Sequence, residues 1–288
     1  MDELDPRLLE IVVDIGANRH VFDQRLTIRA QGILFANEIL DTCEVTIFNL
    51  DRATQDYLLN ATSPYSPNHD DKFLTVFAGR KSYGMTLIYK GSILVSLVSQ
   101  PPDIGITFRC LSAPNFSNTV YSKNSPGITR AIEIAENLAN QMDAKLVNQA
   151  INLPMFSNYS ITGTSQQEIA YLNTFGNFTI FLKKGDTDLL FVRDIFTYLT
   201  GTVRVISEIN GMVGIPEWTE LGVKVTFFID SKTGPGTYID IDSKRYPSFS
   251  GRYGIFKLGF NLTSRDVPFY YIAEAARQIT QGEGFVPT

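Results

Sequence analysis

The sequence predicts a mostly β protein with an α+β insertion, in which two antiparallel β-barrel or β-sandwich domains flank a small α+β domain. Short alternating strands with turn signals between them fill residues 8–111, and a second series begins near Val203. Such series are typical of antiparallel sandwiches and barrels. Between the two series, apolar residues recur at helical spacing after residue 129. The chain is 44% hydrophobic, which is enough to fill a core.

The predicted strands of the N-terminal section alternate between apolar and polar residues or form short apolar runs. Residues 61–71 are polar and contain prolines, which predicts a loop between two of these strands. The strands are Leu8–Val13, Arg25–Ile28, Cys43–Phe48, Phe73–Phe77, Met85–Tyr89, Ser92–Leu97 and Ile104–Leu111.

The stretch Cys43–Leu59 passes from a strand pattern to a short helix pattern within three residues. Asp is a favoured helix N-cap, so Asp51 is expected to satisfy free amides at the start of this helix. Ala53, Tyr57 and Leu58 are expected to lay the helix against the β core or against a neighbouring chain. We interpret the stretch as a structural element of the fold and not as part of a catalytic site.

The middle section changes character after the break Ser122–Gly127. An amphipathic helix is expected over residues 129–143, because apolar residues recur there at spacings of three and four. Ser165–Glu168 matches the capping-box pattern, in which Glu168 would satisfy an amide of the first helical turn. A β-hairpin is expected at Phe178–Val192. Together these elements indicate a small α+β unit.

The C-terminal section returns to the β-rich character of the first. Its predicted strands Val223–Ile229 and Tyr238–Ile241 flank a connection rich in Gly and Pro, and Gly254–Leu262 and Val267–Ile272 form another hairpin pattern. Two β-rich sections around an α+β section indicate a duplicated architecture. The expected domains are an N-terminal β domain, a middle α+β domain and a C-terminal β domain, at residues 1–118, 119–200 and 201–288.

Charge and cysteine content exclude several classes of protein. The 288-residue chain has a formal charge of −5 and no basic cluster larger than Lys183-Lys184, which argues against a nucleic-acid-binding protein. Cys43 and Cys110 lie in apolar stretches and are expected to be buried free thiols rather than a disulfide. The N-terminus lacks the features of a secretory signal, and no stretch reaches the length of a membrane span. The protein is expected to fold in a cytoplasm.

No catalytic, cofactor-binding or metal-binding residue is predicted, and no cofactor is expected. The two histidines, His20 and His69, are interpreted as surface residues, because neither has a cysteine or carboxylate at metal-ligand spacing. The sequence contains neither a serine-hydrolase elbow nor a phosphate-binding glycine loop. An enzyme is therefore not predicted.

Paired carboxylates are the remaining candidates for chemistry, since a glycosidase needs two that face each other. Asp240 and Asp242 share one face of a predicted strand, which suits a cation site. The favoured interpretation is a solvated face opposite Ile239 and Ile241. The other two pairs lie in turns, where Asp is favoured for local hydrogen bonds, and these are Asp70-Asp71 and Asp186/Asp188.

Five motifs, taken in order, resemble those of phage tail baseplate hub proteins. CEVTIFNLDRATQDYL resembles the strand-Asn-Leu-polar-helix stretch near the start of these proteins. Each motif is degenerate, but five in the right order cover most of the chain. The four later stretches that are similar to successive parts of the family are DKFLTVFAGRKSYGMTLIYKGSI, YSITGTSQQEIAYLNTFGNFTIFLKKGD, ISEINGMVGIPEWTELGVKVTFFIDSKTGPGTYIDIDS and GRYGIFKLGFNLTSRD.

The resemblance implies a homotrimeric structural protein of the virion tail baseplate. Hub proteins of this family carry two tail-tube-like β domains per chain, so that three chains imitate the sixfold tail tube while meeting a threefold central spike. The implied partners are the tail tube protein, the spike protein and other baseplate proteins, with the tape measure protein as a further candidate. DNA is expected only in transit during genome ejection, and assembly is expected in the host cytoplasm. The acidic balance adds the hypothesis that carboxylates line the channel.

Three alternatives remain open. A carbohydrate-binding module would stack aromatic side chains on sugars, and the candidates are Trp218, Tyr121 and Tyr246, for which packing in cores or subunit contacts is the favoured interpretation. A cell-wall-degrading tail-tip protein would need an acidic cleft. A tail-tube or tape-associated protein of the same virion would need only one β domain.

Overall fold

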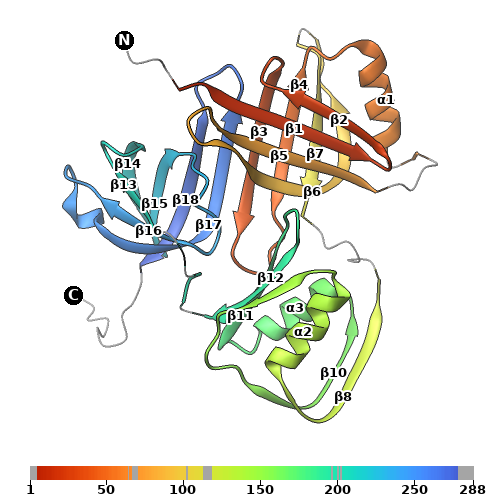
Figure 1. Ribbon diagram of the computed structural model, residues 1–288, viewed down its shortest axis with the longest axis vertical. Helices are drawn as coiled ribbons and strands as arrows, with labels where there is room; N and C mark the ends of the chain where they lie inside the picture. The colour runs from red at the N-terminus through yellow and green to blue at the C-terminus, as the bar shows by residue number, and fades with distance from the viewer. Residues whose placement is uncertain are drawn as a thin grey trace.

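The computed structural model describes residues 5–63, 65–66, 71–101, 103–112, 119–195, 197–199, 201 and 203–277. Strands dominate, and three α-helices and one 3-10 helix accompany them in these residues (Figure 1). In chain order the elements are β1 (Arg7–Ile15), β2 (Asn18–Asp23), β3 (Thr27–Phe35), β4 (Thr42–Phe48), α1 (Arg52–Thr62), β5 (Lys72–Arg80), β6 (Gly84–Val98), β7 (Gly105–Leu111), β8 (Tyr121–Arg130), α2 (Ala131–Gln141), β9 (Lys145–Asn148), β10 (Met155–Gly163), α3 (Ser165–Asn173), β11 (Phe178–Lys183), β12 (Leu189–Asp194), β13 (Arg204–Ser207), β14 (Met212–Thr219), β15 (Gly222–Phe228), β16 (Tyr238–Asp242), η1 (Pro247–Phe249), β17 (Gly251–Thr263) and β18 (Phe269–Arg277).

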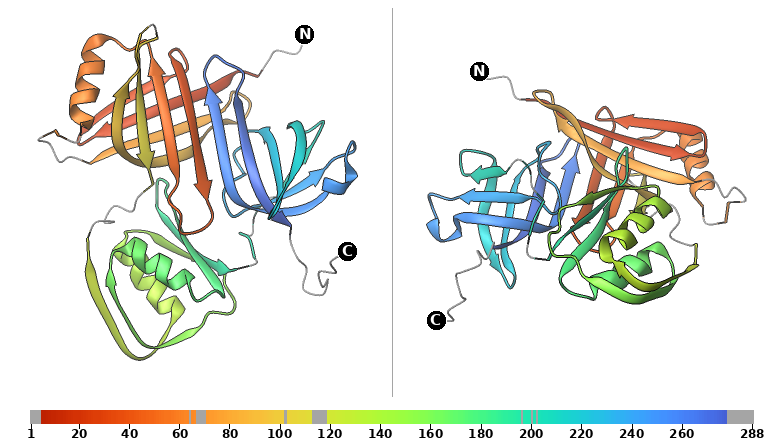
Figure 2. Two further views of the ribbon diagram at one scale, coloured as in Figure 1. Left: turned by 180° about the vertical axis from the view of Figure 1, so that it is seen from behind. Right: turned by 60° about the horizontal axis from the view of Figure 1, so that its bottom comes forward.

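The largest sheet contains 13 strands and runs through both β-rich sections of the chain. Its main path is β14-β15-β18-β17-β3-β4-β7-β6-β5-β1-β2, and β16 and β13 join it through β17. At the junction, β17 pairs with β3 in antiparallel register, with Leu258 opposite Leu34 and Leu262 opposite Ala30. The two β-rich sections therefore share one continuous sheet, and they lie side by side in Figures 1 and 2.

The strand path is open, so the sheet is not a closed barrel. One long strand in each section bends and pairs with strands of two layers. β6 pairs with β5 over Gly84–Ser92 and with β7 over Ser92–Val98. β17 pairs with β16 over Gly251–Gly254 and with β3 over Lys257–Thr263. Of the two predicted alternatives, the closed barrel is wrong, because bulges bend these strands without joining the two ends of the path.

The main core lies between the layers of this sheet. Alternation along β4 places Cys43, Val45 and Ile47 in the core, as predicted. Cys110 of β7 lies directly opposite Cys43, and both are free, buried thiols, which confirms the prediction. Burial raises the pKa of both thiols well above the ordinary value, so they remain protonated and behave as small apolar side chains.

The turn from β4 into α1 follows from three neighbouring residues. Asn49 takes a left-handed backbone conformation with φ of 61°, which Asn tolerates better than most residues. Asp51 is the N-cap, and its carboxylate accepts a hydrogen bond from the Thr54 amide at 2.9 Å, as predicted. Leu58 is fully buried in the main core, so the helix packs on its own chain, while Tyr57 remains partly exposed.

The middle section forms a separate α+β unit with its own core. α2 and α3 pack on the three-stranded sheet β11-β12-β9 and on the two-stranded ribbon β10-β8. The predicted break Ser122–Gly127 lies inside strand β8, and this prediction is wrong. β8 pairs only with β10 in the described residues, so Pro126 can lie there without a ladder donor. Gly127, with φ of 87°, faces the bulge at Asn158.

The capping box of α3 lies one residue earlier than predicted. Thr164 is the N-cap and Gln167 completes the box, so the expected capping role of Glu168 is wrong. Glu168 instead points into the core of the middle unit and is fully buried. The helix starts where Thr164 can accept the Gln167 amide, and this register turns Glu168 inward beside Ile169 and Leu172.

Candidate assembly surface

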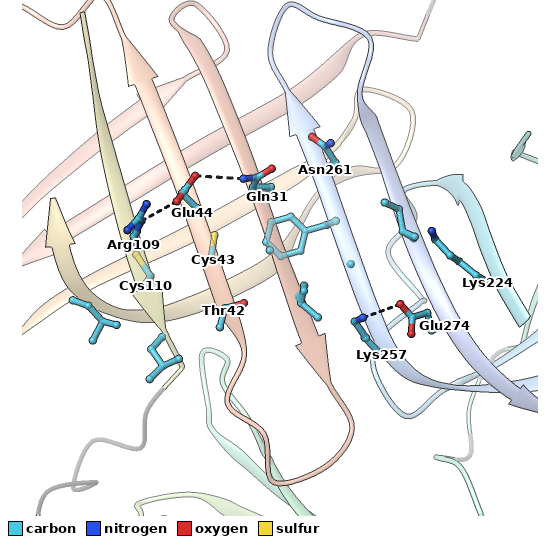
Figure 3. Close-up of a pocket in the computed structure, with 17 residues that line it drawn as sticks. Gln31, Thr42, Cys43, Glu44, Arg109, Cys110, Lys224, Lys257, Asn261 and Glu274 are labelled. Atoms are coloured by element: carbon cyan, nitrogen blue, oxygen red, sulfur yellow. Dashed lines mark hydrogen bonds and ion pairs between the residues drawn. The ribbon is translucent and has the colours of Figure 1, made fainter. Parts of the chain in front are cut away.

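Six neighbouring strands of the large sheet, β15, β18, β17, β3, β4 and β7, have one buried side and one solvent-facing side. Val45, Ile47 and Phe108 lie on the buried side and have no exposed surface. Side chains alternate across a strand, so their neighbours point the opposite way. We call this opposite side the concave face, and its polar side chains include Gln31, Glu44, Arg109, Lys224, Lys257, Asn261 and Glu274 (Figure 3).

The concave face surrounds a cavity of about 650 Å³. Leu94 of β6 and Lys224 of β15 line this same cavity, although five strands separate β6 from β15 along the path. Strands in a flat sheet are about 4.8 Å apart, so only a curved sheet brings both side chains to one cavity. A second hollow of about 420 Å³ adjoins the first and shares Gln31, Glu44 and Asn261 with it.

Charged side chains of opposite sign pair across neighbouring strands on the concave face. The Arg109 Nε donates to the Glu44 Oε2 at 3.0 Å, and the Gln31 Nε2 donates to the Glu44 Oε1 at 3.3 Å. In the other section, the Lys257 Nζ donates to the Glu274 Oε1 at 2.8 Å. Figure 3 shows these two groups on either side of the β3–β17 junction. The face is therefore polar and internally paired, and not acidic.

Two strand edges border the concave face, at β14 and at the Ser92–Val98 part of β6. In the residues that the structure describes, β14 pairs only with β15 and Ile93–Val98 of β6 pairs only with β7, whereas Ser92 also pairs with Phe73 of β5. The Thr62 hydroxyl of α1 is hydrogen-bonded to the Ser96 hydroxyl, so α1 contacts this part of β6. An open edge presents unpaired amides and carbonyls that can bind another strand. Pro216 and the bulge between Val213 and Glu217 interrupt the β14 edge. Another strand could therefore pair with β14 only before and after the bulge.

Both edges also expose apolar side chains. At the β6 edge these are Leu94, Leu97 and Val98, and Ile104 lies in the connection that follows β6. Exposed apolar side chains that cluster together and are surrounded by polar residues are typical of protein contact sites. At the β14 edge they are Ile215, Trp218 and Leu221.

Side chains of the N-terminal section hold the C-terminal section at a set angle. Arg7 donates to the backbone carbonyls of Asp266 and Val267, at 2.6 and 3.1 Å. The Tyr83 hydroxyl donates to the Ile229 carbonyl at 2.7 Å, and the Arg80 guanidinium lies over the Phe228 ring at 5.4 Å. These contacts act together with the β3–β17 ladder to preserve the curvature of the concave face.

The aromatic residues proposed for sugar stacking lie in two different places. Trp218 is 55% exposed and stacks on Phe249 with ring centroids 4.6 Å apart, and Tyr246 packs edge-on against the same Phe249. This cluster lies beside the β14 edge. Tyr121 belongs to the middle unit, so the structure does not bring the three residues together.

Tyr121 takes part in a buried polar cluster that the sequence pattern did not reveal. Its hydroxyl donates to Glu168, and the Tyr159 hydroxyl donates to the other carboxylate oxygen at 2.9 Å. The Lys123 ammonium lies 3.6 Å from the Glu168 Oε1. Burial and the neighbouring Glu168 carboxylate raise the pKa of both tyrosines. Paired in this way, the buried charge is compensated and holds β8, β10 and α3 together.

The described members of the three aspartate pairs either bind a basic side chain or face solvent. Asp240 binds Arg252 through two hydrogen bonds of 2.8 Å, and Asp242 points to solvent on the same side, as the favoured interpretation predicted. Asp188 pairs with Lys184 at 2.8 Å, whereas Asp186 is exposed. The Asp70-Asp71 pair lies partly outside the described residues, since only Asp71 is described.

His20 is partly buried between the rings of Phe22 and Tyr57, so its interpretation as a surface residue is wrong. His69 lies outside the described residues. Among the residues that are described, no group of three or more His, Cys, Asp and Glu side chains is arranged to hold a metal ion. No helix in this part of the chain is long and apolar enough to cross a membrane.

The fold is similar to those of tail proteins of known structure. The tail protein from Neisseria meningitidis MC58 superposes with a TM-score of 0.63 at 10% identity, over 93% of this chain and 96% of that chain. The 43 kDa tail protein of prophage MuSo2 from Shewanella oneidensis gives 0.60 at 8% identity, over 93% and 97%. The E. coli c3393 protein gives 0.62 at 11% identity, over 96% and 79%. It is described as a type VI secretion component similar to the T4 tail proteins gp27 and gp5.

The sequence itself decides the family. No curated protein matches it. The family model described as Baseplate hub gp41 matches residues 8–275, which include both β-rich sections and the middle unit. The resemblance inferred from the five motifs is thereby confirmed, and the chain belongs to the baseplate hub gp41 family.

Proposed function

We propose that this protein forms a homotrimeric hub in a phage tail baseplate, with the concave face lining the channel through which DNA leaves. The observation that supports this proposal best is the pair of open, apolar edges at the two ends of one curved run of strands. The run is β14-β15-β18-β17-β3-β4-β7-β6, and every neighbouring pair in it is antiparallel.

The even number of strands in this run allows copies of the chain to join head to tail by antiparallel pairing. Eight alternating strands leave the first and the last running in opposite directions. The β6 edge of one copy can then pair in antiparallel fashion with the β14 edge of the next copy. Heterologous contacts of this kind generate rings when the rotation between copies closes. The curvature of the concave face favours closure around a central channel.

The division of each run into two halves supports a hub that joins a sixfold tube to a threefold spike. β3, β4, β7 and β6 come from residues 1–118, and β17, β18, β15 and β14 come from residues 201–288. We propose these ranges as two tube-like domains, with 119–200 as the middle domain. Three chains would then present six similar units to a sixfold tail tube while keeping threefold symmetry for a central spike.

The proposed role is structural and non-enzymatic, with assembly in the host cytoplasm. Its proposed partners are the tail tube protein, the central spike protein, neighbouring baseplate proteins and the tape measure protein. Trp218 and Phe249 are better placed for the subunit contact than for sugars, because they lie beside the β14 edge.

The oligomeric state tests this proposal. We expect a trimer with a central channel by light scattering and electron microscopy. Replacing Leu97 and Val98 by lysine would place charges at the β6 edge and shift the protein to monomers, since like charges blunt a strand edge. The matched control is Ile128→Lys on β8, which is 76% exposed and belongs to the separate β10-β8 ribbon of the middle unit.

The control variant is expected to stay trimeric. A wild-type protein that remains monomeric at all concentrations and in the presence of a tube or spike protein would exclude the ring. A trimer that survives the Leu97→Lys/Val98→Lys change would show that other surfaces join the subunits.

A further inference from the structure

The basic side chains of the concave face share one property, which is a carboxylate partner from a neighbouring strand or turn. The eight strands of the run place four basic side chains on this side. The described part of the chain supplies one carboxylate to each. The pairs are Arg109 with Glu44 at 3.0 Å, Lys257 with Glu274 at 2.8 Å, Arg29 with Asp266 at 3.1 Å and Lys224 with Glu217 at 3.8 Å.

The strand register produces three of these pairs directly. Glu44 lies opposite Arg109, Glu274 lies opposite Lys257, and Glu217 lies opposite Lys224. Glu274 also lies opposite Lys224 in the register of β15 and β18, so it lies between two lysines, although its ion pair is with Lys257. Because cross-strand neighbours face the same side of a sheet, each carboxylate meets its cation on the concave face itself.

Stability alone explains these pairs poorly. The Arg109 and Glu44 side chains are 59% and 36% exposed, and exposed ion pairs add little to the stability of a fold. Their effect on a passing polyanion is larger. Arg and Lys that are free to contact phosphates release counterions and bind DNA without regard to sequence. A carboxylate already bound to the cation removes much of that attraction.

We propose that the carboxylates of the concave face mask its basic side chains, so that a duplex polyanion passes the face without being held. This inference rests on the proposed function and replaces the hypothesis of an acidic lining with one of paired charges. The channel wall then keeps its Arg and Lys side chains, but each of them is already paired with a carboxylate. The face then neither binds the phosphates strongly nor repels them from a narrow channel.

Replacing the masking carboxylates tests this inference on the full-length chain. Glu44→Gln, Glu217→Gln and Glu274→Gln together leave Arg109, Lys224 and Lys257 without charged partners. Fluorescence anisotropy with a short labelled DNA duplex at low salt should show affinity at least about tenfold higher than for wild type. The gained affinity should fall with salt, with a logarithmic slope steeper than that of wild type by roughly two to three.

Two further variants separate masking from a general change of charge. A control with Asp56→Asn, Asp103→Asn and Glu136→Gln removes the same charge from exposed positions elsewhere, and it should bind DNA as weakly as wild type. Adding Arg109→Gln, Lys224→Gln and Lys257→Gln to the first variant should abolish the gain. Equal gains in the first variant and the control, no gain in either, or a gain that survives the loss of the three cations would each overturn the inference.

The outcome is separable from that of the ring experiment. If the chain proves monomeric but the three glutamine substitutions create DNA binding, masking holds and the assignment of this face to a channel fails. If the chain is trimeric and the substitutions leave DNA binding unchanged, the hub proposal stands and masking is wrong. Thermal melting of each variant establishes that it is folded when binding is measured.

Discussion

The two halves of the curved sheet are alike on the concave face and differ behind it. Each half contributes four antiparallel strands, one of which is long and bent, β6 in the first half and β17 in the second. Behind the N-terminal half lie β5, β1 and β2 with α1, whereas in the described residues β16, β13 and η1 lie behind the other half. The similarity is confined to the surface that the ring would enclose. In the proposed ring, six such units would have to match at this surface, whereas the layers behind it would be free to differ.

The junction between the halves gives the largest expected effect. A Cβ on Gly32 of β3 would lie 2.4 Å from the Thr42 carbonyl oxygen and 2.5 Å from the Phe260 Cζ of β17. Neither contact can be relieved without moving a strand or a buried ring. Gly32→Ala should lower the free energy of unfolding by about 3 kcal/mol, measured by urea denaturation.

Gly259 of β17 is the matched control, because it lies beside the same junction opposite Ile33. Its nearest contact to an added Cβ is the Ile272 carbonyl oxygen at 3.4 Å, which is an ordinary separation. Gly259→Ala should change stability by less than about 1 kcal/mol. Equal losses in the two variants would mean that the β3–β17 junction is not the tight point that unites the halves.

Local sequence patterns predicted the parts of each half but not their union. Alternation at Cys43, Val45 and Ile47 was sufficient for β4, because a period of two is visible within one strand. The pairing of Leu34 with Leu258 has no local signal, since it joins segments far apart in the chain. The concave face was missed for the same reason, as its ion pairs form only when the register is known.

Ambiguity between neighbouring positions explains the error at α3. The pattern of a hydroxyl residue followed three residues later by Gln or Glu fits both Thr164 with Gln167 and Ser165 with Glu168. Only packing decides between them, because one register buries Ile169 and Leu172 together with Glu168. The buried Tyr121–Glu168 cluster could not be found from composition, since its members come from β8, β10 and α3.

The hairpins β3–β4 and β17–β18 meet at the junction between the two halves, and the aspartates in their connections lie in opposite surroundings. Asp41, before β4, accepts the Phe35 amide at 2.8 Å and lies near Lys183 of the middle unit. Burial raises the pKa of Asp41 from 3.8 to about 7. The folded state therefore holds this proton where the unfolded state has lost it, so stability should fall as pH rises from about 4 to about 7 and then level off.

Asp41→Asn should remove this pH dependence and make the protein more stable than wild type above pH 7, by an amount on the order of 2 kcal/mol. Chemical denaturation at several pH values measures it. Asp56→Asn on the exposed face of α1 is the control and should leave the pH profile of wild type. A wild-type stability that rises between pH 4 and 7 in step with Asp41 ionisation would show that Lys183 outweighs burial.

Asp266, in the β17–β18 turn, should have the smallest effect. It pairs with Arg29 at 3.1 Å, but the two side chains are 55% and 60% exposed, so water and salt screen the attraction. Asp266→Asn should change the free energy of unfolding by less than about 0.5 kcal/mol. A loss well above 1 kcal/mol would indicate a structural pair and weaken its interpretation as a mask for Arg29. A negligible loss, set beside the larger effect at Asp41, would show that charge in the first hairpin tunes stability and charge in the second does not.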